Sequence, residues 1–351
     1  MRLTIRLLIW TAVLNLALGC SVAQAANVGE VELSREGKTS IQMALQLLAS
    51  RQRADGSFAG DRGGQTGIVA ACVLAWMVAG NLPGEGPYGK NVAKSIDYLL
   101  ASAQPSGLLF RGRTEQYVMY HHGLAAICLA EAWGQTRDKR IHDKLKNAIE
   151  LIIRTQNDKG GWRYQPRIYD DDLSVTVMEL LALRAAKDAG INVPRDVIDR
   201  AIAYVKTCGS ERDNDGLSGF SYQPHGGKTW STTAAGLMSM MLCGQYKEYD
   251  LKGAVEYLMK TREKKEDKRW FIYGHYYAAQ AMYQCGALKD FKSYWTKWYP
   301  DIAQQIVKGQ KTTGPERGEY KVSDERYGLW DSAMCVLILG IPYRYLPIYQ
   351  R

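Results

Sequence analysis

Gln156-Asn157-Asp158-Lys159-Gly160-Gly161-Trp162 decides the fold, because turns of the same kind recur along the chain. A second copy is Gln52-Arg53-Ala54-Asp55-Gly56-Ser57-Phe58, and Gln104-Pro105-Ser106-Gly107 lies midway, so that successive glutamines are 52 residues apart. Each turn joins a helix with one polar face to a second helix rich in Ala, Leu and Cys. A fixed period of this size predicts stacked helical hairpins, because one hairpin alone cannot bury its apolar face.

About six hairpins are expected between residues 36 and 340. Their first helices place apolar residues at helical spacing among charged ones, which predicts an outer ring that is wet on one side. Their second helices are apolar almost all round, which predicts a buried inner ring. The inner helices are expected at residues 66–77, 117–133, 173–189, 229–242, 273–285 and 327–339. The chain is therefore predicted to be all-α, a single (α/α)6 toroid with a short C-terminal tail.

The first 25 residues have the features of a secretory signal peptide. Arg2 and Arg6 precede an apolar run over residues 7–18, and Ala23-Gln24-Ala25 offers a small-residue cleavage site. A competing interpretation has Cys20 as the lipidated cysteine of a lipoprotein, and cleavage after Ala25 is favoured. Residues 26–351 are then the toroid domain, and the protein is expected in the periplasm or at the cell surface.

Charge and hydropathy exclude two classes of partner. The chain has a formal net charge of +9, which becomes +7 without the two arginines of the leader. The basic residues are scattered, and the run over residues 260–269 is interleaved with acids, so we expect a solvated loop and no nucleic-acid binding. No apolar segment after the leader is long enough to span a bilayer, which leaves peripheral association with the envelope open.

The turn Gln-x-x-x-Gly-x-Trp/Phe, repeated between such helices, resembles the repeats of squalene and terpenoid cyclases and of protein prenyltransferase β-subunits. The resemblance covers essentially all of the mature chain and is closest to small exported bacterial proteins with the prenyltransferase/squalene-oxidase repeat. It implies an α/α toroid, and an isoprenoid or other apolar small molecule cyclised in a central cavity after protonation by an acid.

The same resemblance implies the catalytic group Asp170, Asp171 and Asp172, which follows the Gly-Gly-Trp turn. Asp172 matches the general acid of an Asp-x-Asp-Asp-Thr motif, Asp170 assists it, and Ser174 matches the threonine. Leu173 stands where the motif has its last aspartate. The alternative is that these carboxylates only cap the following helix, where they would bond free amides and oppose the helix dipole.

Loops that lead into the inner helices of a toroid meet at one mouth, where a substrate is expected to bind. The residues predicted to line it, from the resemblance and from their places on these helices, are Tyr120, His121, His122, Trp230, His275, Tyr276, Tyr327, Trp330 and Asp331. No metal or cofactor is predicted. Asp331, Cys335 and His275 resemble the zinc ligands of prenyltransferases, but the spacing differs from that pattern.

Two other function classes stay open. A non-catalytic toroid that binds a lipid, glycan or protein predicts a filled or shallow centre with the aspartates acting as helix caps. A carbohydrate-active enzyme predicts an open polar groove with two carboxylates at about 5–10 Å, such as Asp172 with Asp324 or Asp331. The cyclase hypothesis instead predicts a deep apolar cavity that Asp172 reaches into.

Overall fold

The structure is a computed structural model that describes residues 31–58, 65–112, 116–245, 250–262, 270–322, 328–343 and 345–349. The expected signal peptide lies outside these ranges, as do Cys20, Asp324 and Tyr327. None of the helices in the described ranges combines the length and apolar composition that crossing a bilayer would require.

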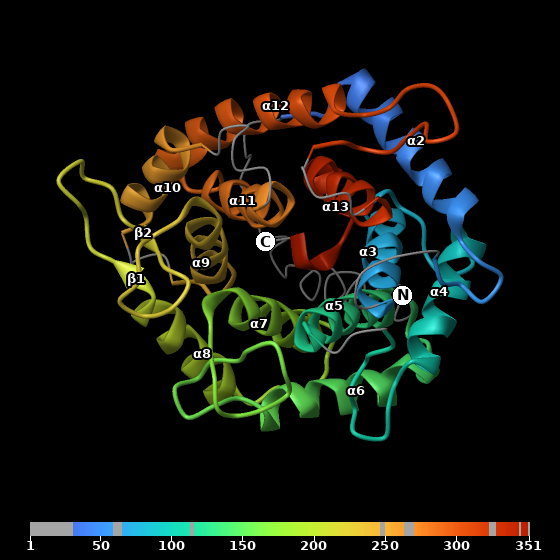
Figure 1. Cartoon of the computed structure of the whole chain (residues 1–351), viewed down its shortest axis with the longest axis horizontal. Coiled ribbons are helices and arrows are strands. Elements are labelled where there is room, and N and C mark those ends of the chain that lie inside the picture. Colours follow the sequence, from blue (N-terminus) through green and yellow to red (C-terminus); the bar gives the residue numbers. More distant parts are fainter. Residues whose placement is uncertain are drawn as a thin grey trace, which may run out of the picture.

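Six helices form a closed inner ring, in which each packs on the next and the last packs on the first (Figure 1). Nearly every residue of these helices is buried, as the all-round apolar sequence predicts. The all-α toroid expected from the sequence is therefore confirmed. The inner helices are α3 (Gln65–Val78), α5 (Val118–Thr136), α7 (Leu173–Asp188), α9 (Trp230–Leu242), α11 (Phe271–Cys285) and α13 (Leu329–Gly340).

Six further helices surround the inner ring and bury only their apolar faces (Figure 1). Two-residue strands β1 (Gly209–Ser210) and β2 (Gly219–Phe220) pair in the fourth hairpin, and η2 (Lys289–Phe291) precedes the last outer helix. The outer helices are α2 (Arg35–Arg51), α4 (Gly89–Ala101), α6 (Lys139–Arg154), α8 (Arg195–Thr207), α10 (Leu251–Lys260) and α12 (Lys292–Lys308).

In four of the hairpins, the turn needs a glycine for two separate reasons. Each of these glycines has a left-handed backbone, with φ between 85° and 99°. Each also presses on the next outer helix so closely that an added Cβ would clash with a backbone carbonyl oxygen. The glycines and the carbonyls are Gly56 on Lys94, Gly107 on Asn147, Gly160 on Arg200 and Gly318 on Met43.

The glutamine of the turn bonds the same neighbouring helix. Gln52 Nε2 donates to the Asn91 carbonyl at 2.8 Å, and Gln156 Nε2 donates to the Val197 carbonyl at 2.9 Å. Gln310 Nε2 donates to the Ser40 carbonyl at 2.8 Å and so joins the sixth hairpin to the first outer helix, α2. In each of these three turns the glutamine bonds backbone of the next outer helix, and the bond from Gln310 closes the ring.

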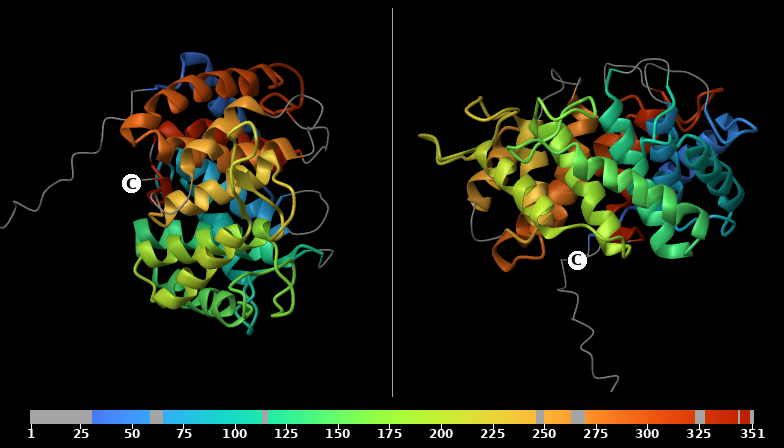
Figure 2. Two further views of the ribbon diagram at one scale, coloured as in Figure 1. Left: turned by 90° about the vertical axis from the view of Figure 1, so that its left-hand side faces the viewer. Right: turned by 90° about the horizontal axis from the view of Figure 1, so that it is seen from below.

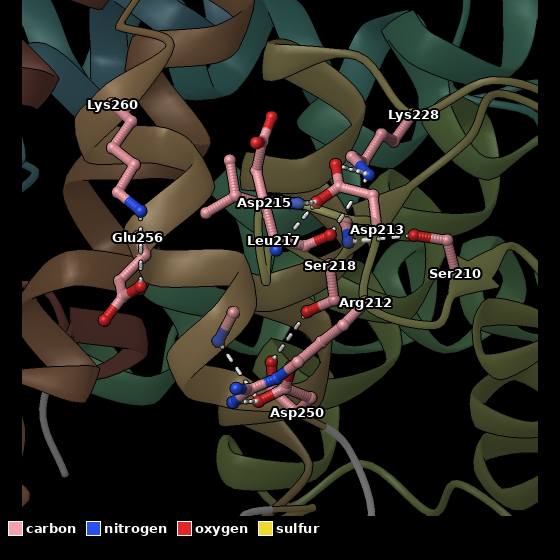
Figure 3. A network of polar contacts seen from close by, with 12 residues as sticks. Ser210, Arg212, Asp213, Asp215, Leu217, Ser218, Lys228, Asp250, Glu256 and Lys260 are labelled. Atoms are coloured by element: carbon pink, nitrogen blue, oxygen red, sulfur yellow. Dashed lines mark hydrogen bonds and ion pairs between the residues drawn. The ribbon is translucent and has the colours of Figure 1, made fainter.

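The fourth turn uses ion pairs where the first, third and sixth use glutamine, and Cys208 stands 52 residues after Gln156. Arg212 donates to both oxygens of Asp250 at 2.6 and 2.8 Å, and Asp250 caps the next outer helix, α10 (Figure 3). Within the turn, Lys228 Nζ lies 2.7 Å from Asp213 Oδ2. A bidentate arginine thus makes the link between hairpins that the glutamine side chain makes elsewhere.

The C-terminal tail crosses one end of the ring, away from the long hairpin loops (Figures 1 and 2). It contains the short helices η3 (Ile341–Tyr343) and η4 (Pro347–Tyr349), which pack on the inner helices. The Ile348 N–H donates to Glu131 Oε1 of α5 at 3.1 Å, and Leu346 and Ile348 are buried. The tail therefore closes this end of the toroid.

Replacing Gly160 by alanine is expected to destabilise the protein by about 3 kcal/mol or more, because left-handed strain adds to the overlap with α8. Gly216→Ala is the matched control: Gly216 has a φ of 74°, but an added Cβ meets nothing within 4 Å. Strain alone should cost that variant about 1–2 kcal/mol. Denaturant unfolding measures both, and equal losses would contradict the close approach as the main cause.

Stability is expected to fall with rising pH because of Glu131. Burial raises its pKa to about 8, although the Ile348 N–H lowers it, against an ordinary value of 4.5. The contribution of protonated Glu131 to the free energy of unfolding is complete below pH 4.5. It decreases by about 1.4 kcal/mol per pH unit above that and is lost once the pH has risen through 8. In denaturant unfolding at several pH values, Glu131→Gln should flatten this decline, and an unchanged slope would exclude Glu131 as its source.

Candidate functional site

The N-terminal ends of the inner helices meet at the end of the ring opposite the tail, and we call this end the mouth (Figure 2). Backbone N–H groups of the turns fix the rotation of four inner helices there, each donating to a side chain on the outer side of the helix. The pairs are Leu109 with His122, Trp162 with Thr176, Phe220 with Thr233 and Tyr320 with Ser332, at 3.0–3.3 Å.

A residue two positions before such an anchor is rotated by about 200° and faces the ring axis. In α11 the outward residue is His275, which stacks on Trp298 of α12 at 6.0 Å. The axis-facing residues at this level are defined as the mouth floor: Tyr120, Ser174, Ser231, Tyr273 and Trp330. All of them except Ser174 are partly exposed, so the mouth is open to solvent as far as this floor.

The ring is filled below the mouth floor. The residues four positions further along the same helices face the axis too and are all buried, namely Leu124, Met178, Ala235, Tyr277 and Met334. These residues therefore do not form the deep central cavity that the resemblance implied. At the far end, a cavity of about 10 Å³ between the tail and helices α9 and α11 has room for about one water.

Asp172 lies at the mouth as the N-cap of α7 and is completely buried. Its Oδ1 accepts from the Ser174 hydroxyl at 2.5 Å and from the Val175 N–H at 3.0 Å. Its Oδ2 has no hydrogen-bond partner, and the Arg163 Nε lies 3.7 Å away. Burial raises the pKa of Asp172 despite the opposing effects of Ser174, Val175, Tyr222 and Arg163. The carboxyl thus caps the helix through Oδ1, while Oδ2 lies beside the Arg163 guanidinium.

The two preceding aspartates have different surroundings. Asp171 is 4% exposed and lies in the wall, where Oδ2 accepts from Asn157 at 2.8 Å and pairs with Lys159 at 3.2 Å. Burial would raise the pKa of Asp171, but Tyr204, Asn157 and Lys159 together hold it below its ordinary value. Asp170 is exposed on the loop. Of the three consecutive carboxylates, Asp170 therefore lies on the exposed loop, Asp171 in the wall and Asp172 at the N-cap of α7.

The structure adds residues at the mouth that the sequence did not single out. The hydroxyls of Tyr164 and Tyr222 are 2.5 Å apart, and the Arg163 guanidinium lies 5.4 Å from the centre of the Tyr164 ring. A signal was present: Tyr-Gln-Pro occurs at residues 164–166 and again at 222–224, each time two residues after the turn aromatic. Equivalent tyrosines of neighbouring repeats thus meet beside Asp172.

Of the predicted substrate-binding residues, the mouth brings together Tyr120, Trp330 and, beside its floor, His121. His121 is partly exposed, and its ring lies 5.8 Å from that of Phe110. Burial lowers the pKa of His121 to about 4. Asp331 is buried in the first turn of α13, opposite α7 in the ring.

The structure places the other predicted binding residues in the wall. His122 uses both ring nitrogens, one on the Leu109 N–H and one on the Ala148 carbonyl at 3.2 Å. Trp230 donates to the Leu258 carbonyl at 3.0 Å, and His275 stacks on Phe271. Tyr276 is buried. Among the described residues, no three His, Cys, Asp or Glu side chains gather in a way that could hold a metal ion.

No protein-family model and no curated protein matches the chain, but solved structures do. An inactive variant of the GH76A α-1,6-mannanase of Salegentibacter sp. HEL1_6, in complex with α-1,6-mannotriose, superposes with a TM-score of 0.63. It is 9% identical and covers 88% of this chain and 99% of its own. Two consecutive aspartates are replaced by asparagine in that variant.

Two further neighbours have the same fold. The GH76 α-mannanase of Bacteroides thetaiotaomicron has a TM-score of 0.59 at 13% identity and covers 91% of this chain and 97% of its own. An unsaturated glucuronyl hydrolase specific for heparin has a TM-score of 0.58 at 13% identity, with coverage of 87% and 96%. At such identities the likeness establishes the fold, an (α/α)6 toroid that this chain shares with glycoside hydrolases.

Arg163→Met is expected to raise the pKa of Asp172 further, because it removes the cation beside the unbonded Oδ2. Arg167→Met removes an exposed cation from the same loop and should leave that pKa unchanged. Carbon-detected NMR titration of the Asp172 carboxyl measures both variants. An equal response to the two substitutions would show that Arg163 does not act on Asp172 locally.

Proposed function

We propose that the protein is a carbohydrate-active enzyme that binds a glycan at the mouth and cleaves it with Asp172 as general acid. The environment of Asp172 carries this proposal: it is buried, its pKa is raised, and its Oδ2 lies 3.7 Å from the Arg163 Nε at the mouth. A carboxyl group with a raised pKa holds its proton more readily than an ordinary aspartate and can donate it to a glycosidic oxygen. The rigid N-cap geometry would hold that proton donor in place.

The surroundings of Asp172 suit a sugar. Tyrosine and tryptophan rings offer flat apolar faces beside hydroxyl groups, and the mouth floor adds the serines Ser174 and Ser231. The toroid neighbours support the same class of substrate, since one is an α-1,6-mannanase seen with α-1,6-mannotriose. Its inactive variant lacks two consecutive aspartates, and this chain has consecutive aspartates at its mouth.

Glycoside hydrolysis needs a second carboxylate, and we assign this role to Asp170. Asp170 is exposed, and its charge, like that of Asp172, raises the pKa of Arg163 although burial opposes this, so Arg163 lies within reach of both. An exposed, solvated carboxylate suits a base that activates water. Asp171 is bound into the wall by Asn157 and Lys159 and does not suit this role.

Isoprenoid cyclisation, which the sequence resemblance implied, receives less support. Protonation of an alkene needs an unusually strong acid, whereas burial makes Asp172 a weaker acid than an ordinary aspartate. The buried layer below the mouth floor also leaves no deep apolar cavity along these residues. The same geometry that opposes this reaction is compatible with proton donation to a glycosidic oxygen.

A glycan-binding module without catalysis is the second candidate, and two observations favour it. Asp172 caps α7 through Val175, and Asp171 holds the turn, as expected for aspartates with a purely structural role. The centre of the ring is also filled, as that hypothesis predicts. Binding and turnover must therefore be measured separately.

Asp172→Asn is expected to lower turnover by about 10²–10⁴-fold while binding persists, because asparagine still caps a helix but cannot donate an acidic proton. Asp170→Asn should also lower turnover. Asp158→Asn, an exposed aspartate on the same turn, is the control. Reducing-end release from α-1,6-mannan, starch and heparin measures turnover. Full activity of Asp172→Asn would contradict its role, and binding without wild-type turnover would favour the second candidate.

A further inference from the structure

We infer that a row of aromatic side chains crosses the mouth along a diameter of the ring and binds a linear glycan over several consecutive sugars. The row, called the aromatic strip, consists of Tyr117, Tyr164, Tyr120, Tyr273 and Trp270. This inference rests on the proposed function and makes it more specific: the substrate is a polymer, and it is cut within the chain.

One half of the strip lies at the start of α5. The rings of Tyr117 and Tyr164 meet edge to face, with centres 4.9 Å apart. The rings of Tyr164 and Tyr120 lie 6.1 Å apart at an angle of 30°. The Met119 N–H donates to the Tyr164 carbonyl at 3.0 Å, which holds the loop of the third hairpin against α5. These three rings therefore form one continuous surface built from two repeats.

The other half lies at the start of α11. Trp270 is the N-cap of this helix, and its ring lies 6.4 Å from that of Tyr273, edge to face. Helices α5 and α11 stand opposite each other, with α7 and α9 between them on one side and α3 and α13 on the other (Figure 1). The two halves of the strip thus begin at opposite walls of the mouth.

The halves approach each other over the mouth floor, because Tyr120 and Tyr273 both face the axis. Tyr120 belongs to α5 and Tyr273 to α11, and both are partly exposed residues of the mouth floor. Asp172 accepts a hydrogen bond from Ser174, the mouth-floor residue of α7, at 2.5 Å. Because α7 lies between α5 and α11 on one side of the ring, Asp172 lies beside the middle of the strip, where an internal bond of a bound chain would be placed.

The outer ends of the strip are exposed. Tyr117 is 43% exposed and Trp270 is 50% exposed, so both rings are accessible to a ligand at the mouth. A short sugar over Asp172 would touch only Tyr120 and Tyr273, whereas a longer chain would also cover the two ends. Affinity should therefore increase with chain length, and long chains should be cut internally.

The test uses Asp172→Asn, so that binding is measured without turnover. Calorimetry gives the Kd for two series of oligosaccharides of increasing length, α-1,6-linked mannooligosaccharides and maltooligosaccharides. These series are chosen because one toroid neighbour is an α-1,6-mannanase and another is an α-amylase. We expect affinity to rise with length in at least one series. Tyr117→Ala and Trp270→Ala, each added to Asp172→Asn, should weaken the longest ligand by about tenfold and leave the shortest unchanged.

Tyr345→Ala, also added to Asp172→Asn, is the matched control, since Tyr345 is 54% exposed but lies on the tail at the other end of the ring. It should change no affinity. The strip would be overturned if affinity did not depend on ligand length or if neither series bound. It would also be overturned if Tyr345→Ala weakened the longest ligand as much as Tyr117→Ala or Trp270→Ala. Length-dependent binding by a wild-type protein that releases no product would instead support the strip and refute only the proposed hydrolysis.

Discussion

The structure depends on how the turns are pressed against the next hairpin. In four of the described turns a left-handed glycine lies against a backbone carbonyl of the following outer helix, and in three of these four the glutamine side chain bonds that helix as well. This contact fixes both the spacing and the angle between successive hairpins. Repetition of one contact with one geometry bends the stack, and the bond from Gln310 to Ser40 completes the ring.

Ring closure is what creates a site. Residues far apart in the chain share the mouth only because the inner helices return to their starting point. Tyr164 and Tyr222 occupy equivalent positions of adjacent repeats, and the rotation between hairpins turns their hydroxyls toward each other. The anchors to His122, Thr176, Thr233 and Ser332 set the rotation of four inner helices, and thereby decide which side chains face the axis.

Local patterns were enough to predict the ring, because its elements are fixed by period, glycine and apolar spacing. The first inner helix, expected at 66–77, spans Gln65–Val78. The sixth outer helix, α12, starts at Lys292 and runs through Pro300, where local sequence would end a helix. Burial of Trp295 and Trp298 outweighs the one hydrogen bond that proline removes.

The site could be predicted only in part, because its chemistry depends on contacts between repeats. The Asp170–Asp172 segment was found from its resemblance to the Asp-x-Asp-Asp-Thr motif, but neither the desolvation of Asp172 nor its approach to Arg163 follows from local sequence. The filled centre depends in the same way on which large side chains, such as Tyr277, face the axis. The sequence resemblance therefore predicted the architecture well and the environment of the acid poorly.

The most direct test of the account is a crystal structure of Asp172→Asn with a bound linear oligosaccharide long enough to cross the mouth. The account predicts a closed ring with sugars lying across the mouth and a glycosidic oxygen within hydrogen-bond distance of residue 172. Sugar bound on the outer wall or at the tail end, with nothing near residue 172, would contradict it.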